Sequence, residues 1–337
     1  PNKEVNMAFR ILSIDGGGIR GILPGQILVA LEQKLKEKTG DPDAKIGQFF
    51  DMVAGTSTGA ILAAAYVCPD ADGFKYSAQD AVDIYLKDGD EIFDVSIWQK
   101  ISTAVGLSDE KYDAERLEES LKKTFGDTKL SQLKKPTCFV SYNIDEREPR
   151  IFKQHLAKSA NEHDYLVIDA LRGSSAAPTY FETAKIRSFD PNEKAQILID
   201  GGMVANDPAL VAYSEAISKG YATGIADMVI VSLGTGRKLK RYDYAKAKGW
   251  GLLGWAKPSI DIALEGGPQM VEYHMEQIAA TVKSKTKHYI RIKPKLFDAA
   301  PDLDNATPEN LAALKQAGID NAELLDAQLD EIVELLV

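Results

Sequence analysis

The chain has 337 residues, of which 45% are hydrophobic and 27% are charged, a composition that excludes a largely disordered or fibrous protein. Its apolar runs are too short to span a membrane, and two cysteines, Cys68 and Cys138, cannot build a disulfide framework. The formal net charge is −10, and residues 301–337 carry nine acidic side chains against one basic. Because nucleic-acid binding needs a net basic face, we do not expect it as a main role.

Taken in chain order, the hydrophobic pattern predicts strands that alternate with helices. The expected strands are Phe9–Ile14, Met52–Ala54, Thr137–Tyr142, Gln196–Ile199, Asp227–Leu233 and His288–Ile292. The expected helices are one opened by Pro24, then Ala60–Val67, Ala114–Thr124, Tyr165–Leu171 and Pro208–Ser218. This alternation predicts an α/β fold with a mainly parallel central sheet flanked by helices in three layers. We see no repeat or linker, so we expect a single domain over residues 1–337.

The acidic segment 301–337 predicts two packing helices at the end of the chain. Thr307 is expected to cap the first of them and Gly318 to end it. The second is expected to begin at Asp320, with Glu323 three residues later as in a capping box.

The strongest local signal is the pentapeptide G-T-S-T-G from Gly55 to Gly59, which follows an expected strand and opens an expected helix. A sharp strand-to-helix turn of this kind pushes the Ser57 hydroxyl out of the sheet, and glycines allow the backbones to approach closely. The helix N-terminus favours negative charge that develops near the serine. The pattern therefore predicts Ser57 as a nucleophile, although a helix-capping turn of the same composition is the alternative.

A second signal is D-G-G-G-I-R-G at Asp15–Gly21, where three glycines follow a strand. Their successive N–H groups can bind an anion, either a phosphate or the oxyanion of a tetrahedral intermediate. The same glycines fit the dinucleotide fingerprint G-x-G-x-x-G. That fingerprint needs an acidic residue at the end of the next strand, but the residues at this distance, Glu32–Glu37, fall on a helix. Dinucleotide binding is therefore disfavoured.

A serine nucleophile needs a base, and the sequence offers two kinds. Asp200 ends an apolar run and precedes two glycines, a position where α/β sheets place functional groups. The order Ser57, Asp200 and then His274 or His288 also matches the Ser–Asp–His order of α/β-hydrolases. None of the four histidines lies in a loop-like motif, and the other two are His155 and His163. The residues alone leave the dyad and the triad open.

Taken together, these motifs and two others make the chain similar to the patatin-like phospholipases. In addition to the three motifs above, S-S-A-A-P-T-Y-F and S-L-G-T-G occur in the family's order, and the segment after D-G-G resembles the family's helix start. The matching segments are Asp15–Gly21, Gly55–Gly59, Ser174–Phe181, Asp200–Gly202, Asn206–Leu210 and Ser232–Gly236.

The resemblance implies lipid acyl hydrolysis of the phospholipase A or lysophospholipase type, by a serine esterase with a Ser–Asp dyad and no metal or cofactor. Ser57 would be the nucleophile and Asp200 its base, and an acyl-enzyme would form. The implied oxyanion-hole donors are the N–H groups of Gly16, Gly17, Gly18 and Thr58. The implied supporting residues are Arg20, Gly55, Gly59, Gly201 and Gly202. An acyltransferase that uses the same serine, a Ser–His–Asp esterase and a non-catalytic lipid-binding relative are the alternatives.

Two of the three tryptophans lie in one glycine-containing segment with nearby lysines, Lys246–Lys257. Tryptophan suits membrane interfaces and lysine suits anionic lipid, so a membrane-facing surface is the interpretation we test. It would consist of Trp250, Leu252, Leu253 and Trp255. We expect acyl-lipid substrates, peripheral membrane contact and no secretory signal, as in a cytoplasmic protein, with a secreted effector as the alternative.

Overall fold

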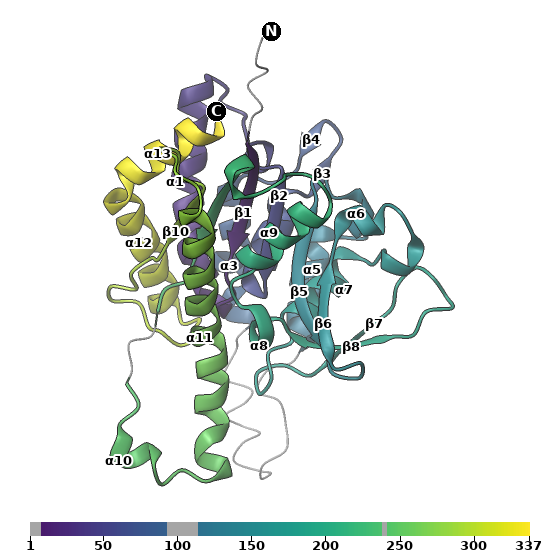
Figure 1. Cartoon of the computed structure of the whole chain (residues 1–337). Coiled ribbons are helices and arrows are strands. Elements are labelled where there is room, and N and C mark those ends of the chain that lie inside the picture. Colours follow the sequence, from purple (N-terminus) through teal and green to yellow (C-terminus); the bar gives the residue numbers. More distant parts are fainter. Residues whose placement is uncertain (1–7, 93–113, 238–240) are drawn as a thin grey trace.

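The computed structural model describes residues 8–92, 114–237 and 241–337 (Figure 1). Eight described strands form one sheet in the order β10-β9-β1-β2-β5-β8-β7, with β6 on β5. In chain order these strands are β1 (Phe9–Ile14), β2 (Met52–Thr56), β5 (Thr137–Asn143), β6 (Glu148–Phe152), β7 (Ala184–Ile186), β8 (Gln196–Asp200), β9 (Met228–Leu233) and β10 (Tyr289–Ile292). A separate hairpin pairs β3 (Pro69–Asp70) with β4 (Gly73–Phe74).

The five strands from β10 to β5 are parallel, whereas β6, β7 and β8 add antiparallel pairings at one side. The expected α/β sandwich with a mainly parallel centre is therefore confirmed, and the sheet as a whole is mixed. β6 and β7 are strands that the sequence pattern did not predict, because each is short and only partly buried.

Alternate residues of the central strands serve two cores, which makes the fold three-layered. Leu12 and Ile14 of β1 belong to the larger core, and Ile11, which precedes them and points to the other face of the sheet, belongs to the smaller one. The larger core contains residues of α1 (Ile22–Thr39), α2 (Thr58–Tyr66), α3 (Ala78–Ile92), α5 (Ala114–Phe125), α7 (Val167–Ser174), α12 (Pro308–Leu324) and α13 (Asp326–Leu336). The smaller core contains residues of α9 (Ala209–Ser218) and α11 (Leu252–Ala280). Three short helices are α6 (Gln154–Ala157), α8 (Gly202–Ala205) and α10 (Tyr244–Ala247).

The last two helices differ from the prediction at their junction. Thr307 caps α12 as expected, because its hydroxyl accepts a hydrogen bond from the Asn310 N–H. The expected stop at Gly318 and start at Asp320 are wrong, since α12 runs on to Leu324 and α13 begins at Asp326. A Cβ at Gly318 would lie 2.5 Å from the Gln26 Cβ, so this glycine lets α12 pack closely on α1. It is a packing glycine inside a helix.

The two ends of the described sheet strands point to opposite ends of the molecule. β1 begins at the end of the molecule where α13 lies, and α8, which follows β8, lies toward the opposite end (Figure 1). Beyond α8, α10 and the first half of α11 project from the body. No helix among residues 8–92, 114–237 and 241–337 is long and apolar enough to cross a membrane.

Candidate active site

Ser57 occupies the turn between β2 and α2 in a backbone conformation that non-glycine residues rarely adopt. Its φ is 55° and its ψ is −124°, a strained geometry that costs about 1–3 kcal/mol. The flanking glycines permit the turn: a Cβ at Gly55 would lie 2.3 Å from the Gly59 carbonyl oxygen, and one at Gly59 would lie 2.1 Å from the Ile14 carbonyl oxygen. The strain is stored where the side chain must leave the sheet, which is typical of a functional position.

Sheet register brings Asp200 to the same level as Ser57. Thr56 pairs with Val140 of β5, so Ser57 follows at the level of Ser141, and Ser141 pairs directly with Asp200. β8 is antiparallel to β5, and its last residue, Asp200, lies opposite the middle of β5. Asp200 therefore ends a strand, as the sequence predicts, but this strand is antiparallel to its neighbour.

Ser57 and Asp200 line the same pocket, and the Ser57 side chain is near enough to act on the Asp200 carboxylate, which is itself almost completely buried. Burial raises the pKa of Asp200 to about 6, against the lowering effects of hydrogen bonds from the Gly202 N–H and from Ser57. The Gly202 N–H lies 2.7 Å from Asp200 Oδ1 and fixes that oxygen. A Cβ at Gly201 would lie 2.2 Å from the Val140 carbonyl oxygen, so the chain can turn here only with glycine. A buried carboxylate with a raised pKa suits proton transfer near neutral pH.

Ser174, at the end of α7, links the turn at Ser57 to β5. Its Oγ accepts a hydrogen bond of 2.9 Å from the Ser57 N–H and donates one of 2.5 Å to the Val140 carbonyl. Ser174 belongs to the matching segment Ser174–Phe181, but no local pattern indicates this role. Because the Ser57 N–H is engaged by Ser174, it is not available to stabilise an oxyanion.

The glycine loop after β1 faces the same space. The Gly16 N–H donates to the Asn206 carbonyl at 3.1 Å, and the Gly16 carbonyl accepts from the Thr235 hydroxyl at 2.8 Å. The N–H of Gly16, one of the expected oxyanion donors, is therefore already engaged by the Asn206 carbonyl. Within the described part of the chain, no hydrogen bond engages the N–H groups of Gly17 and Gly18, and both residues line the pocket around Ser57.

Side chains cannot replace these glycines. A Cβ at Gly17 would lie 2.2 Å from the Thr235 Oγ1. Gly18 has a φ of 56°, and a Cβ there would lie 2.1 Å from the Leu303 carbonyl oxygen. Thr58 begins α2 beside this loop, with its hydroxyl held by Tyr85 Oη at 2.7 Å. The loop and the start of α2 together offer backbone donors to an anion near Ser57.

Arg20 stabilises the loop from within the protein. It is buried, and it donates to the Gly17 carbonyl at 3.4 Å and to the Gly236 carbonyl at 3.2 Å. These contacts fix the glycine loop, in agreement with the supporting position expected for Arg20.

A buried ion cluster supports the base of the loop. Arg291 of β10 binds Asp15 through both carboxylate oxygens, at 2.7 Å and 2.5 Å, and its Nη1 lies 3.1 Å from Asp207. Asp15 precedes the glycines, and Asp207 follows Asn206, which anchors Gly16. Burial raises the pKa of Asp15 to about 7, whereas Arg291 acts to lower it. The cluster thus ties β10 to both chain segments that hold the loop, a role that no local sequence signal indicated.

A pocket of about 890 Å³, including its mouth open to solvent, surrounds Ser57 and Asp200. Its walls come from α2, α3, α5, α11 and the segment that follows α7, and they are mostly apolar. The apolar lining residues are Ile61, Ile84, Tyr85, Leu117, Leu121, Ala177, Tyr180, Phe181, Leu264 and Leu303. This shape and polarity suit a hydrocarbon chain whose polar end lies at Ser57.

The four histidines lie in the described residues, and none of them lines this pocket. His288 precedes β10 and bonds the Met228 carbonyl. It therefore lies where the parallel strands begin, whereas Ser57 lies where they end. His155 binds Glu215, and His274 packs against Tyr273 on α11. The structure brings Ser57 and Asp200 together and brings no histidine to them, so the triad alternative has no geometric support.

The residues expected to face a membrane lie outside the pocket, on the projecting segment before and within the first turns of α11. Trp250 is partly buried, whereas Leu252, Leu253 and Trp255 are exposed.

Comparison with known proteins decides the family. Residues 12–213 match the family model described as patatin-like phospholipase, which covers more than half of the chain. The chain belongs to the patatin-like phospholipase family. Patatin-like protein 2 of Arabidopsis thaliana is 33% identical, with 91% of this chain and 81% of that protein aligned. Patatin-like protein 4 of the same plant is also 33% identical, over 98% of this chain and 86% of that protein.

Among solved structures, human GIVD cytosolic phospholipase A2 in complex with methyl gamma-linolenyl fluorophosphonate is similar over 99% of this chain and 60% of that one. The TM-score is 0.49 and the sequence identity is 12%. The patatin-like phospholipases are lipid acyl hydrolases, and this chain is one of them by family.

Proposed function

We propose that the protein cleaves fatty-acyl esters of membrane lipids, as a phospholipase A or lysophospholipase, through a Ser57–Asp200 dyad and without a metal or cofactor. The observation that carries the proposal is the Ser57 hydroxyl beside the buried Asp200 carboxylate, inside an apolar pocket that also exposes unengaged backbone N–H groups. Family membership supports the lipid substrate, and the contacts of the site support the mechanism.

In the first half-reaction, Ser57 Oγ attacks the ester carbonyl carbon while Asp200 takes the hydroxyl proton. The N–H groups of Gly17 and Gly18, with that of Thr58, stabilise the oxyanion, a contribution of about 3–4 kcal/mol for one such donor. The intermediate collapses to an acyl-enzyme, and Asp200 returns its proton to the departing alcohol. In the second half-reaction, Asp200 takes a proton from water, the hydroxide attacks the acyl carbon, and the fatty acid leaves as Ser57 recovers its proton.

The raised pKa of Asp200 matters to both half-reactions. An ordinary aspartate is too weak a base for a serine hydroxyl, and burial moves its pKa from 3.8 to about 6. The strained turn keeps Ser57 Oγ at the carboxylate, and Ser174 keeps the turn in place. The site thus replaces the imidazole of a triad by a desolvated carboxylate in a fixed position.

The direct test measures hydrolysis of a p-nitrophenyl acyl ester and of phospholipid by wild type, Ser57→Ala and Asp200→Asn. We expect each variant to lose at least about a thousandfold in kcat/KM with unchanged thermal unfolding, because each removes a reacting group. Ser214→Ala, a remote exposed serine on α9, is the matched control and should retain full activity. Full activity of Asp200→Asn would disprove the dyad, and loss of activity in His274→Ala or His288→Ala would favour a triad instead.

Two additions to the assay separate the alternatives. A chelator should leave the rate unchanged if no metal takes part. Coenzyme A should not accept the acyl group if the enzyme is a hydrolase, whereas acyl-CoA formation would identify an acyltransferase.

A further inference from the structure

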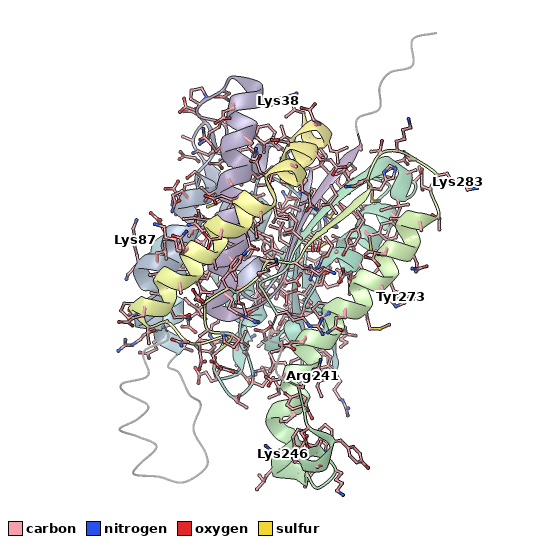
Figure 2. All side chains as sticks on the ribbon, turned by 90° about the vertical axis from the view of Figure 1, so that its left-hand side faces the viewer. Lys38, Lys87, Arg241, Lys246, Tyr273 and Lys283 are labelled. Atoms are coloured by element: carbon pink, nitrogen blue, oxygen red, sulfur yellow. The ribbon has the colours of Figure 1, made fainter. Side chains whose placement is uncertain are left out.

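The segment from Arg241 to Trp255, here called the tip, projects from the end of the molecule that carries α8 (Figure 1). It contains α10 and the first turns of α11. Figure 2 shows Arg241 and Lys246 on this projection, at the far end of the molecule from Lys38 of α1. The same end carries the active site, since α8 directly follows Asp200 and Gly201.

The tip exposes large apolar side chains to a degree that its own folding does not explain. Leu252 is 94% exposed, Leu253 is 91% exposed and Tyr244 is 80% exposed. Exposure of apolar side chains to water is unfavourable, so adjacent exposed leucines need an explanation. Contiguous exposed apolar patches mark interaction surfaces.

The exposure does not result from a loose chain, because the tip has an aromatic scaffold. The Trp250 ring packs edge-on against Tyr242 and against Trp255, with centroids 5.4 Å and 5.0 Å apart. A Cβ at Gly254 would lie 2.9 Å from the Trp250 Cβ, so the scaffold requires that glycine. Trp250, expected to face a membrane, is partly buried and forms the centre of this scaffold.

The charge of the tip complements an anionic surface. Arg241, Lys246 and Lys248 are exposed, and the one acidic residue of the tip, Asp243, caps α10 by accepting from the Lys246 N–H. The sequence from Gly234 to Lys257 contains seven basic residues and one acidic residue, in a chain whose net charge is −10. Basic residues around exposed leucine and tryptophan are typical of segments that bind anionic lipid.

We propose that the tip docks the protein on an anionic phospholipid bilayer, with Leu252 and Leu253 in the acyl region and the basic side chains at the headgroups. Leu264 of α11 lines the pocket, and it lies twelve residues, or about 18 Å of helix, beyond Leu252. The Leu264 carbonyl also accepts from Asn206 Nδ2 at 2.8 Å, which joins α11 to the glycine loop. Docking therefore holds the pocket at a fixed distance above the bilayer. Its use in substrate delivery rests on the proposed function, whereas docking itself does not.

The experiment measures sedimentation of the full chain with vesicles of phosphatidylcholine alone and of phosphatidylcholine mixed with phosphatidylserine. We expect binding to the mixed vesicles, and a loss of about tenfold or more in the double variant Leu252→Ser/Leu253→Ser. Leu324→Ser, an exposed leucine on α12, is the control and should bind as wild type does. No binding by wild type, or equal binding by the double variant, would overturn the proposal.

A second arm tests the charge. Lys246→Glu/Lys248→Glu should weaken binding to the mixed vesicles, whereas Lys283→Glu/Lys285→Glu, the same charge change beyond the other end of α11, should not. Equal loss in both would show a general charge effect and would contradict a docking tip.

A third arm separates docking from catalysis. Ser57→Ala should bind vesicles as wild type does, so this result stands even if the proposed reaction fails. Leu252→Ser/Leu253→Ser should hydrolyse a soluble short-chain ester at the wild-type rate and lose activity only on vesicles. If light scattering instead shows a wild-type dimer that this variant dissociates, the tip binds a second copy of the chain and the bilayer proposal is wrong.

Discussion

The buried contacts that support the site, here called the floor, lie at the same end of the molecule as the tip and are built in the opposite way. The floor consists of the Asp15–Asp207–Arg291 cluster together with Ser174 and Asp200. On the floor, the buried Asp15 and Asp207 each pair with Arg291, whose side chain is 8% exposed. On the tip, Leu252 and Leu253 are almost fully exposed. The floor thus gains its geometry from contacts within the protein, whereas the outward face of the tip lacks such contacts. Substitutions on the floor should therefore change stability and chemistry together, and substitutions on the tip should change neither.

Arg291→Met offers the most severe test of this difference. The change keeps much of the side-chain volume but leaves the Asp15 and Asp207 carboxylates without their cation, so we expect a loss of about 3–5 kcal/mol in the free energy of unfolding. Chemical denaturation provides the measurement. Lys293→Met, which removes an exposed partner of Glu272, is the control and should change stability by less than about 1 kcal/mol. Equal effects in the two variants would mean that the buried cluster is not important for stability.

Ser174→Ala tests a single contact of the floor. The variant leaves the Ser57 N–H and the Val140 carbonyl without their partner, and we expect it to cost about 1–3 kcal/mol of stability. The turn that aims Ser57 should also lose rigidity, so kcat should fall while KM changes little. Steady-state kinetics on a soluble ester measures both. A change in KM alone would place Ser174 in substrate binding instead.

The difference between local and distant contacts also explains what the sequence could predict. β1 was predicted with its observed bounds, and the Ser57 turn was found, because both depend on patterns within a few residues. The roles of Ser174 and Arg291 depend on partners 117 and 276 residues away, so no local pattern carries them. Gly318 was wrongly predicted to end a helix because its role, close packing against α1, also depends on a distant contact.

α11 shows a second limit. It is a helix of 29 residues, but Pro258 and Pro268 lie inside it and conceal it from a pattern-based prediction. The tip was identified by its composition, whereas its projection and the exposure of its leucines came only from the structure.

The pH dependence tests the chemistry of the floor. Because the base must be ionised and burial raises the pKa of Asp200 to about 6, kcat/KM on a soluble ester should fall about tenfold per pH unit below that value and be flat above it. The same shift means that the folded protein holds this proton more tightly than the unfolded chain does. Its contribution to stability therefore decreases as the pH rises from about 4 to about 6. A rate that stays constant down to about pH 5 would contradict the assignment of Asp200.

The smallest expected effect lies on the tip. Leu252→Ser/Leu253→Ser should leave the free energy of unfolding within about 0.5 kcal/mol of wild type, because side chains that are 94% and 91% exposed lose almost no packing. Trp250→Ala is the informative comparison, since it removes the ring that Tyr242 and Trp255 pack against. It should make the tip easier to cleave by protease without lowering the stability of the body. A large loss of global stability in the leucine variant would mean that these residues are buried in solution, and the tip would then resemble the floor.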